Sequence, residues 1–350
     1  MAEPGDIPEA DVTPGCAHPR HVYDLIGHQA AEKQIINAVH SGRMHHAWLI
    51  TGAAGIGKAT LAYRMIRYIL GGTTLLEGHM DIPASDPVAT RIRALSHGDF
   101  FLLRRPYDHK TKKLKSEIPI AEIRRMRDYF TQKPSEGGWR VALVDKMDEM
   151  NRKSENGILK TLEEPPEKTC LILLADSPGR LLPTIRSRCF HLPLSGVSQA
   201  DMTPWLTDKS DLDPEGRRAA IALSGGAPGK AIALAQTAQE VLYPLIMYTQ
   251  NLARPSAKAE HILAGNLAAQ TMLRERELFW NGLIDLLHFQ TIYSATQEWR
   301  GFGDPLPLQK SVGTWKHLWQ EISELWRVSE GLNMEPKTAL LEAFYKIRTA

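Results

Sequence analysis

The most chemically distinctive stretch of the sequence is Thr51–Thr60, which is rich in glycine and contains a lysine. Gly52, Gly57 and Lys58 fit the phosphate-binding pattern G-x-x-x-x-G-K, with Gly55 as a further glycine between them. Glycines let backbone N–H groups curve around phosphate oxygens, and the lysine reaches the outer phosphates. The stretch follows an apolar run and opens a helical pattern, whose N-terminus favours anions. We therefore predict that the three glycines and the lysine contact a nucleotide phosphate.

One position of this pattern lacks the residue that metal chemistry needs. A Ser or Thr hydroxyl normally follows the lysine and ligates Mg²⁺, but this chain has Ala59 there, and a methyl group cannot coordinate a metal. Thr60 comes next, but one helical step rotates its side chain by about 100°. The backbone cradle and Lys58 remain, so nucleotide can still bind, whereas Mg²⁺-dependent hydrolysis should suffer more.

A second motif places an acid at the end of a predicted strand. Val141–Val144 is apolar and is followed by Asp145 and Lys146. In P-loop ATPases this aspartate joins the Mg²⁺ shell, and in AAA+ members a following glutamate polarises the attacking water. This chain keeps the aspartate, and we predict that Asp145 belongs to the degenerate nucleotide site. Lys146 stands at the position of the glutamate, cannot accept a proton at neutral pH and would repel a metal. The alternative for this stretch alone is an ordinary strand with a capping aspartate. Together, Ala59 and Lys146 indicate an ATPase fold whose hydrolytic site is not maintained.

These motifs need a scaffold of alternating strands and helices. Between residues 23 and 194, short apolar runs alternate with amphipathic stretches, a pattern typical of a parallel sheet whose strands are buried on both faces. The predicted strands are Ala47–Thr51, Phe100–Leu103, Arg140–Val144 and Cys170–Ala175, and helical stretches include Gly57–Leu70 and Ile120–Tyr129. We predict an α/β P-loop domain with a parallel sheet, followed by a small helical lid and an all-α collar domain.

The chain is too long for one ordinary core, and we divide it into four parts. Residues 1–20, rich in Pro and Gly, are predicted to be a flexible leader. Residues 21–195 form the P-loop domain, 196–240 the lid and 241–350 the collar that serves oligomerisation. In the collar, one helical face is predicted to be core or subunit interface rather than a platform for stacking bases. That face consists of Trp315, Leu318, Trp319, Ile322, Leu325 and Trp326.

Composition excludes several classes of protein. The 42 Lys and Arg residues nearly balance the 40 Asp and Glu residues, so no chain-wide basic field exists to hold nucleic acid unaided. Cys16, Cys170 and Cys189 are too few and too widely spaced for a disulfide framework or a cysteine-based zinc site. The sequence shows no signal-peptide core and no membrane-length apolar run. We therefore expect a cytoplasmic protein.

Further stretches resemble the AAA+ clamp-loader family of bacterial DNA polymerase III. Asn151–Pro166 is similar to the family pattern N-x-x-x-x-N-A-L-L-K-x-L-E-E-P-P, with Gly157 in place of alanine. Ser187–Cys189 is the S-R-C motif, and Leu25–His28 resembles the L-I-G-Q box. The matches cover residues 23–194. Gamma/tau subunits of the family keep an intact catalytic pair, whereas the delta prime subunits commonly have a degenerate nucleotide site, which this sequence resembles better.

The resemblance implies a largely non-hydrolysing member of a hetero-oligomer that loads the sliding clamp on primed DNA during replication. Its own ATPase activity would be weak or absent, and it would be a component of the DNA polymerase III holoenzyme. The implied partners are gamma/tau and delta subunits, with the clamp and DNA reached through the complex, and no membrane. No cofactor is required, although ATP or ADP can occupy the degenerate loop. Residues 71–99 contain no cysteine, so the zinc module common in the family is not expected.

In the family, the S-R-C arginine enters the ATP site of a neighbouring subunit. Carried over, Arg188 is an arginine finger acting in trans. A guanidinium is always charged, and its forked donors suit a γ-phosphate that gains charge during transfer. The alternatives are that Arg188 caps the preceding helix or pairs with a local acid, and Arg186 is its nearest competitor. Cys189 is expected to be a packing residue.

Other readings stay open. The chain could be a catalytically active, gamma/tau-like clamp-loader ATPase, or an AAA+ remodeller of recombination junctions. Asp176 stands where active members place a polar sensor of the γ-phosphate, and its charge would repel a triphosphate. The basic run Tyr107–Lys115, which includes Lys110–Lys115, is expected to be a solvated loop, with contact to DNA phosphates as the alternative. We assign Lys230, beside the Gly225–Gly229 turn, no role.

Overall fold

The structure is a computed structural model that describes residues 8–13, 16–252, 254, 256–306, 310–332 and 334–349. Parts of the predicted leader, residues 1–7 and 14–15, therefore lie outside the described residues. The chain divides into two compact units. The first comprises residues 1–197 with 227–229, and the second comprises residues 198–226 with 230–350.

The first unit is built on a five-stranded sheet in which all neighbouring strands are parallel. The strand order is β2 (Phe100–Leu103), β5 (Arg140–Val144), β6 (Thr169–Ala175), β1 (Ala47–Thr51) and β7 (Phe190–Pro193). The four strands predicted from apolar runs are confirmed, with Thr169 added to the start of β6. The edge strand β7 was not predicted, because only Leu192 of its four residues is buried.

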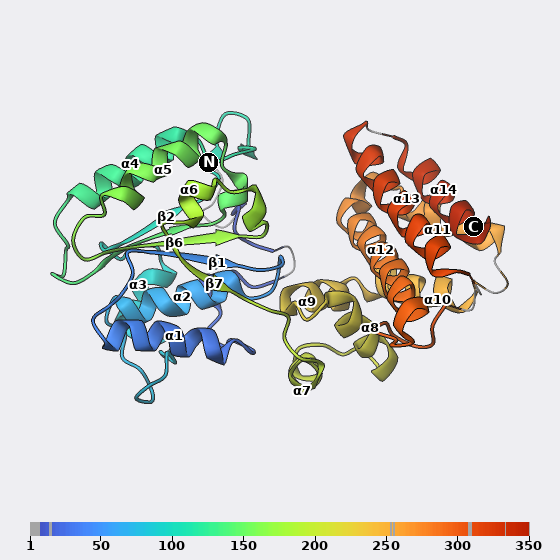
Figure 1. Ribbon diagram of the computed structural model, residues 1–350, viewed down its shortest axis with the longest axis horizontal. Helices are drawn as coiled ribbons and strands as arrows, with labels where there is room; N and C mark the ends of the chain where they lie inside the picture. The colour runs from blue at the N-terminus through green and yellow to red at the C-terminus, as the bar shows by residue number, and fades with distance from the viewer. Residues whose placement is uncertain are drawn as a thin grey trace. The chain divides into compact units, whose positions relative to one another are not determined.

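Helices cover both faces of this sheet (Figure 1). One face carries α1 (Gln29–His40), α2 (Lys58–Ile69) and α3 (Pro87–Arg93), and the other carries α4 (Ile120–Thr131), α5 (Arg152–Glu163) and α6 (Pro183–Arg186). In β1, Trp48 and Ile50 join the core under α2, whereas Ala47 and Leu49 join the core under α5. Successive side chains of a strand point to opposite faces, so a strand covered twice is apolar throughout.

Short elements connect these strands and helices. They are η1 (Pro19–His21), η2 (Met147–Glu149), η3 (Pro178–Arg180) and the antiparallel pair β3 (Tyr107–Asp108) and β4 (Lys113–Leu114). The basic run thus forms a small hairpin, with the side chains of Lys110, Lys112, Lys113 and Lys115 exposed.

The second unit contains only helices within its described residues. They are α7 (Gln199–Lys209), α8 (Pro214–Ser224), the greater part of α9 (Pro228–Gln236), the π-helix η4 (Ala238–Leu242), α10 (Tyr243–Gln250), α11 (Ala257–Leu267), η5 (Gln270–Met272), α12 (Leu273–Thr296), α13 (Val312–Gly331) and α14 (Pro336–Thr349). The helical region predicted after Pro193 is confirmed.

The aromatic face predicted in the second unit lies on α13. Trp315, Leu318 and Ile322 are buried, and the Trp326 ring stacks on Trp280 of α12 with 5.4 Å between centroids. The face is therefore mainly core of the helical unit. Across the described part of the chain, no helix combines the length and apolarity needed to cross a membrane.

Candidate nucleotide-binding site

The order of the strands brings the predicted phosphate loop next to two acidic loops. β1 is paired with β6 up to Thr51 and Ala175, and β6 is paired with β5 on its other side. The carboxyl ends of parallel strands lie at one edge of the sheet, where α/β proteins commonly bind ligands. The segments that follow β1, β6 and β5 therefore meet there, with Lys58, Asp176 and Asp145 in them.

The glycines of the loop are required by its backbone path. Gly52 has φ +150°, and a Cβ atom there would lie 2.7 Å from the carbonyl oxygen of Leu194. Gly57 has φ +111° and is the N-cap of α2. L-residues with side chains rarely adopt such angles, so the sharp turn between β1 and α2 depends on glycine.

Lys58 is buried, and its ammonium group has three acceptors within the protein. Its Nζ donates to the carbonyl oxygens of Gly52, at 2.8 Å, and Ala53, at 2.9 Å. The third contact is an ion pair with Oδ1 of Asp176, at 2.5 Å. A lysine ammonium has three donors, so all three are engaged by the chain itself.

Asp176 also binds a second lysine. Its Oδ2 accepts a hydrogen bond from Nζ of Lys146 at 2.6 Å, so one carboxylate bridges two ammonium groups. Burial acts to raise the pKa of Asp176, but the hydrogen bonds and charges of Lys146 and Lys58 outweigh it and hold the pKa below its usual value. The Asp176 carboxyl is therefore ionised at neutral pH.

The backbone that carries Asp176 is itself held by a carboxylate. Asp148, in η2, accepts hydrogen bonds from the backbone N–H groups of Asp176, at 2.7 Å, and Ser177, at 2.9 Å. Sequence reasoning predicted only that Asp176 would repel a triphosphate. The ion pair with Lys58 depends on β6 lying beside β1, and the order of the strands is not readable from apolar runs alone.

Asp145 follows β5 and is buried. Burial, followed by the negative charge of Asp11, raises the pKa of Asp145 to about 7. A Mg²⁺ ligand needs an ionised carboxylate, and this group is only partly ionised near neutrality. Lys146 occupies the position of the catalytic glutamate, and its ammonium group donates a hydrogen bond to Asp176.

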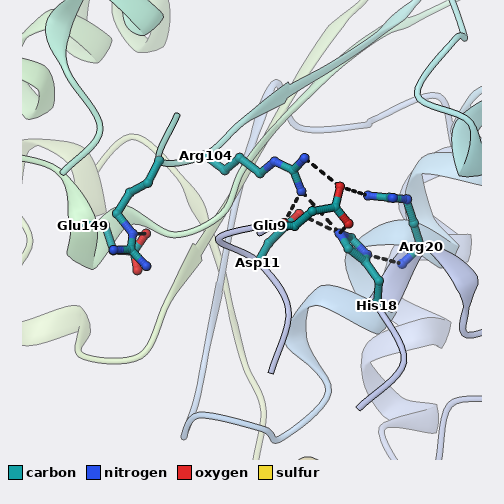
Figure 2. A network of polar contacts seen from close by, with 7 residues as sticks. Glu9, Asp11, His18, Arg20, Arg104 and Glu149 are labelled. Carbon is teal, nitrogen blue, oxygen red and sulfur yellow. Dashed lines mark hydrogen bonds and ion pairs between the residues drawn. The ribbon is translucent and has the colours of Figure 1, made fainter. Parts of the chain in front are cut away.

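The nearby charge on Asp11 comes from the segment predicted to be a flexible leader, which makes a polar network with the loop after β2 (Figure 2). The Asp11 side chain is fully buried, and the Arg104 guanidinium bonds to it and to Glu9, the latter at 2.8 Å. Nε2 of His18 lies 3.0 Å from Oδ2 of Asp11, and Arg20 pairs with Glu9 at 2.7 Å. These contacts hold the described part of the segment against the rest of the first unit.

Arg105 makes a separate ion pair with Glu149 of η2, at 2.7 Å. The two consecutive arginines after β2 therefore bind different segments. Arg104 holds the N-terminal segment, and Arg105 holds the turn that supplies Asp148.

These residues do not fit a magnesium–nucleotide complex. Ala59 offers no hydroxyl to the metal, the ammonium of Lys58 is already engaged, and Asp176 would face the phosphates with a negative charge. Within the ranges that the structure describes, no group of three or more His, Cys, Asp or Glu side chains is placed to hold a metal ion.

Arg188, the predicted finger, lies just after α6 and is bonded locally. Its Nη2 is 3.0 Å from Oε1 of Glu163, the last residue of α5, and its Nη1 donates to the carbonyl oxygen of Thr184 at 3.0 Å. The side chain is 36% exposed and Glu163 is 50% exposed. Arg188 therefore has the two local partners foreseen as alternatives, an acid and a helix carbonyl, and still reaches solvent.

The two neighbours of this arginine differ from it. Arg186 is exposed, and it makes only backbone hydrogen bonds among those found in the described chain. Cys189 packs against the core under α5, and burial raises its pKa to about 12, so its thiol stays protonated. This agrees with a packing role and not with a nucleophile.

The chain is similar in sequence to subunits of DNA polymerase III. A family model described as "DNA polymerase III, delta subunit" matches residues 27–198. The delta' subunit of Escherichia coli (strain K12) is 29% identical over 62% of this chain and 64% of that protein. The delta' subunit of Pseudomonas aeruginosa is 32% identical over 52% of this chain and 53% of that protein. The gamma subunit of Buchnera aphidicola is 31% identical over 54% of this chain and 48% of that protein.

The similarity covers part of each relative, since the chain spans 48% to 64% of the length of these three proteins. The identities to gamma and delta' subunits are alike and do not separate the two types. The parallel α/β unit with its phosphate loop and S-R-C motif coincides with the matched residues. Residues 27–198 therefore form a domain of the AAA+ clamp-loader family of DNA polymerase III subunits.

Proposed function

We propose that the chain is a delta prime-type clamp-loader subunit that hydrolyses little or no ATP and stimulates a neighbouring ATPase subunit through Arg188. The observation that carries this proposal is the ion pair between Lys58 and Asp176, because the lysine that should bind phosphate is bound to a carboxylate of its own chain. Ala59 and Lys146 support it, since both remove groups that hydrolysis needs.

The proposed partners follow from the family. A subunit without its own turnover contributes only within a hetero-oligomer, so gamma/tau and delta subunits are its expected neighbours. The sliding clamp and primed DNA are reached through that complex. The helical second unit is the candidate region for oligomerisation.

The ion pair with Glu163 is compatible with a role for Arg188 in trans. Both side chains are more than a third exposed, and such surface pairs contribute only about 0–1 kcal/mol. A triphosphate on a neighbouring subunit carries more charge than one carboxylate, so it competes well for the guanidinium. Glu163 would then hold Arg188 in place until the subunits meet.

The test is Arg188→Ala in a loader reconstituted with gamma/tau-type and delta subunits. An arginine finger accelerates its site by about 10³-fold or more, so the neighbouring site should become nearly silent. Total ATP turnover should fall by the share of that one site, while gel filtration shows an intact complex.

Two variants serve as controls in the same assay. Arg186→Ala removes the neighbouring arginine at the end of α6, and Glu163→Gln removes the ion pair but keeps Arg188. Both should keep wild-type turnover. Unchanged turnover with Arg188→Ala, or an equal fall with Arg186→Ala, would assign the finger elsewhere.

A gamma/tau-like active ATPase is the second candidate, because the Buchnera aphidicola gamma subunit is 31% identical over a similar share of the chain. That role requires turnover at Lys58, which the isolated chain would have to show.

A further inference from the structure

The phosphate loop contains a complete anion-binding arrangement whose anion is supplied by the chain. The ammonium of Lys58 is directed by two carbonyls of the loop toward the loop after β6. There it meets Oδ1 of Asp176 at 2.5 Å, a distance typical of a charge-assisted bond.

The carboxylate is positioned from both sides. Its second oxygen is bound by Lys146 at 2.6 Å, and its backbone is fixed by the two N–H bonds to Asp148. Asp176 is less than a quarter exposed, so this is a partly buried bridge with limited screening by water. Three contacts thus hold this carboxylate against Lys58, one from Lys146 and two through Asp148.

We propose that Asp176 acts as a built-in substitute for phosphate, which excludes nucleotide from the loop, and that Lys146 keeps it in place. The loop retains the glycine-dependent backbone turn and the lysine of a phosphate site, so its capacity to bind a phosphoryl group is latent rather than lost. Asp176, more than Ala59, decides whether a polyphosphate can enter.

The charges around the loop explain why one substitution should reveal this capacity. With Asp176 ionised, Lys58 and Lys146 share one negative charge. Asp176→Asn keeps the size and shape of the side chain but removes that charge, so both ammonium groups lose their counter-ion. Two unpaired lysines beside a helix N-terminus favour a polyphosphate anion.

The inference shares the Lys58–Asp176 ion pair with the proposed function, but its test measures binding by the chain alone and needs neither a loader nor turnover. The probes are ADP and inorganic pyrophosphate without Mg²⁺. Their binding is measured by calorimetry and by the change in the thermal midpoint of unfolding. Wild-type protein should show no binding at millimolar probe. Asp176→Asn should bind at least about tenfold more tightly and show a midpoint raised by about 2 °C or more at saturation.

Three companion variants locate the effect. Lys146→Met loosens Asp176 but leaves its negative charge beside Lys58, so this variant should bind the probes far more weakly than Asp176→Asn. Asp176→Asn combined with Lys58→Met should lose the gained binding, which places it at the loop. Asp176→Ala repeats the test if the Asn variant fails to fold, as judged by its circular dichroism.

Either of two results would overturn the inference. One is wild-type protein that binds ADP or pyrophosphate as tightly as the Asp176 variants. The other is a folded Asp176 variant that binds neither probe, or whose binding persists without Lys58. Neither result would change the prediction for Arg188→Ala, which is measured as ATP turnover in the reconstituted loader.

Discussion

At the scale of single residues, Asp176 alters the loop more than Ala59 does. Ala59 removes one metal ligand but leaves the phosphate cradle unchanged. Asp176 binds Lys58, the side chain predicted to reach the outer phosphates. An active P-loop ATPase holds a lysine, a metal ion and a phosphate at the carboxyl edge of its sheet. In this chain, Lys58, Lys146 and the carboxylate of Asp176 lie there instead.

Asp145 gives a prediction about pH. Its folded-state pKa of about 7 lies above the ordinary value of about 4, so the folded protein binds a proton that the unfolded chain has released between these values. This group therefore lowers stability as pH rises from about 4 to 7, and the full penalty applies above 7. Asp145→Asn removes it, so the variant should gain stability over wild type at pH 8 by up to a few kcal/mol, and less at pH 5.

Urea unfolding of both proteins at the two pH values measures this difference. A variant whose advantage is the same at pH 5 and pH 8 would show that Asp145 titrates normally in the folded protein.

At the scale of elements, the N-terminal segment is joined to β2 through charges. Its Pro and Gly content suggests flexibility, yet Glu9 and Asp11 converge on Arg104 (Figure 2). Pro and Gly favour irregular backbone, which can be held in place by side chains as well as left free. The same network adds negative charge near Asp145 and so connects this segment with the edge of the sheet.

Arg104→Ala should therefore destabilise the first unit. It leaves the fully buried Asp11 without its guanidinium partner, which should lower the free energy of unfolding by about 2–4 kcal/mol, near the range for breaking a buried ion pair. Arg105→Ala is the matched control, because its partner Glu149 retains some exposure, and it should cost less. Equal losses for the two variants in denaturant unfolding would mean that the N-terminal network adds no stability of its own.

At the scale of the whole molecule, the sequence predicted the elements better than their contacts. Apolar runs located four strands because those strands are buried on both faces, whereas β7 has a single buried residue and left no such run. The change from an α/β unit to helices was visible in the spacing of apolar residues.

Part of the candidate site could also be predicted from the sequence. Gly52, Gly57 and Lys58 are a local pattern, so the sequence located the loop. The partner of Lys58 depends on which strand lies beside β1, and the network around Arg104 joins residues far apart in the chain. Contacts of that kind are set by tertiary packing, which local patterns do not encode.

We predict that this chain does not hydrolyse ATP by itself. The most direct measurement is ATP turnover by the purified chain with Mg²⁺, compared with its Lys58→Ala variant to identify any contaminating ATPase. We predict that the two proteins are indistinguishable and at background. Turnover in the wild-type chain that disappears in Lys58→Ala would contradict the account.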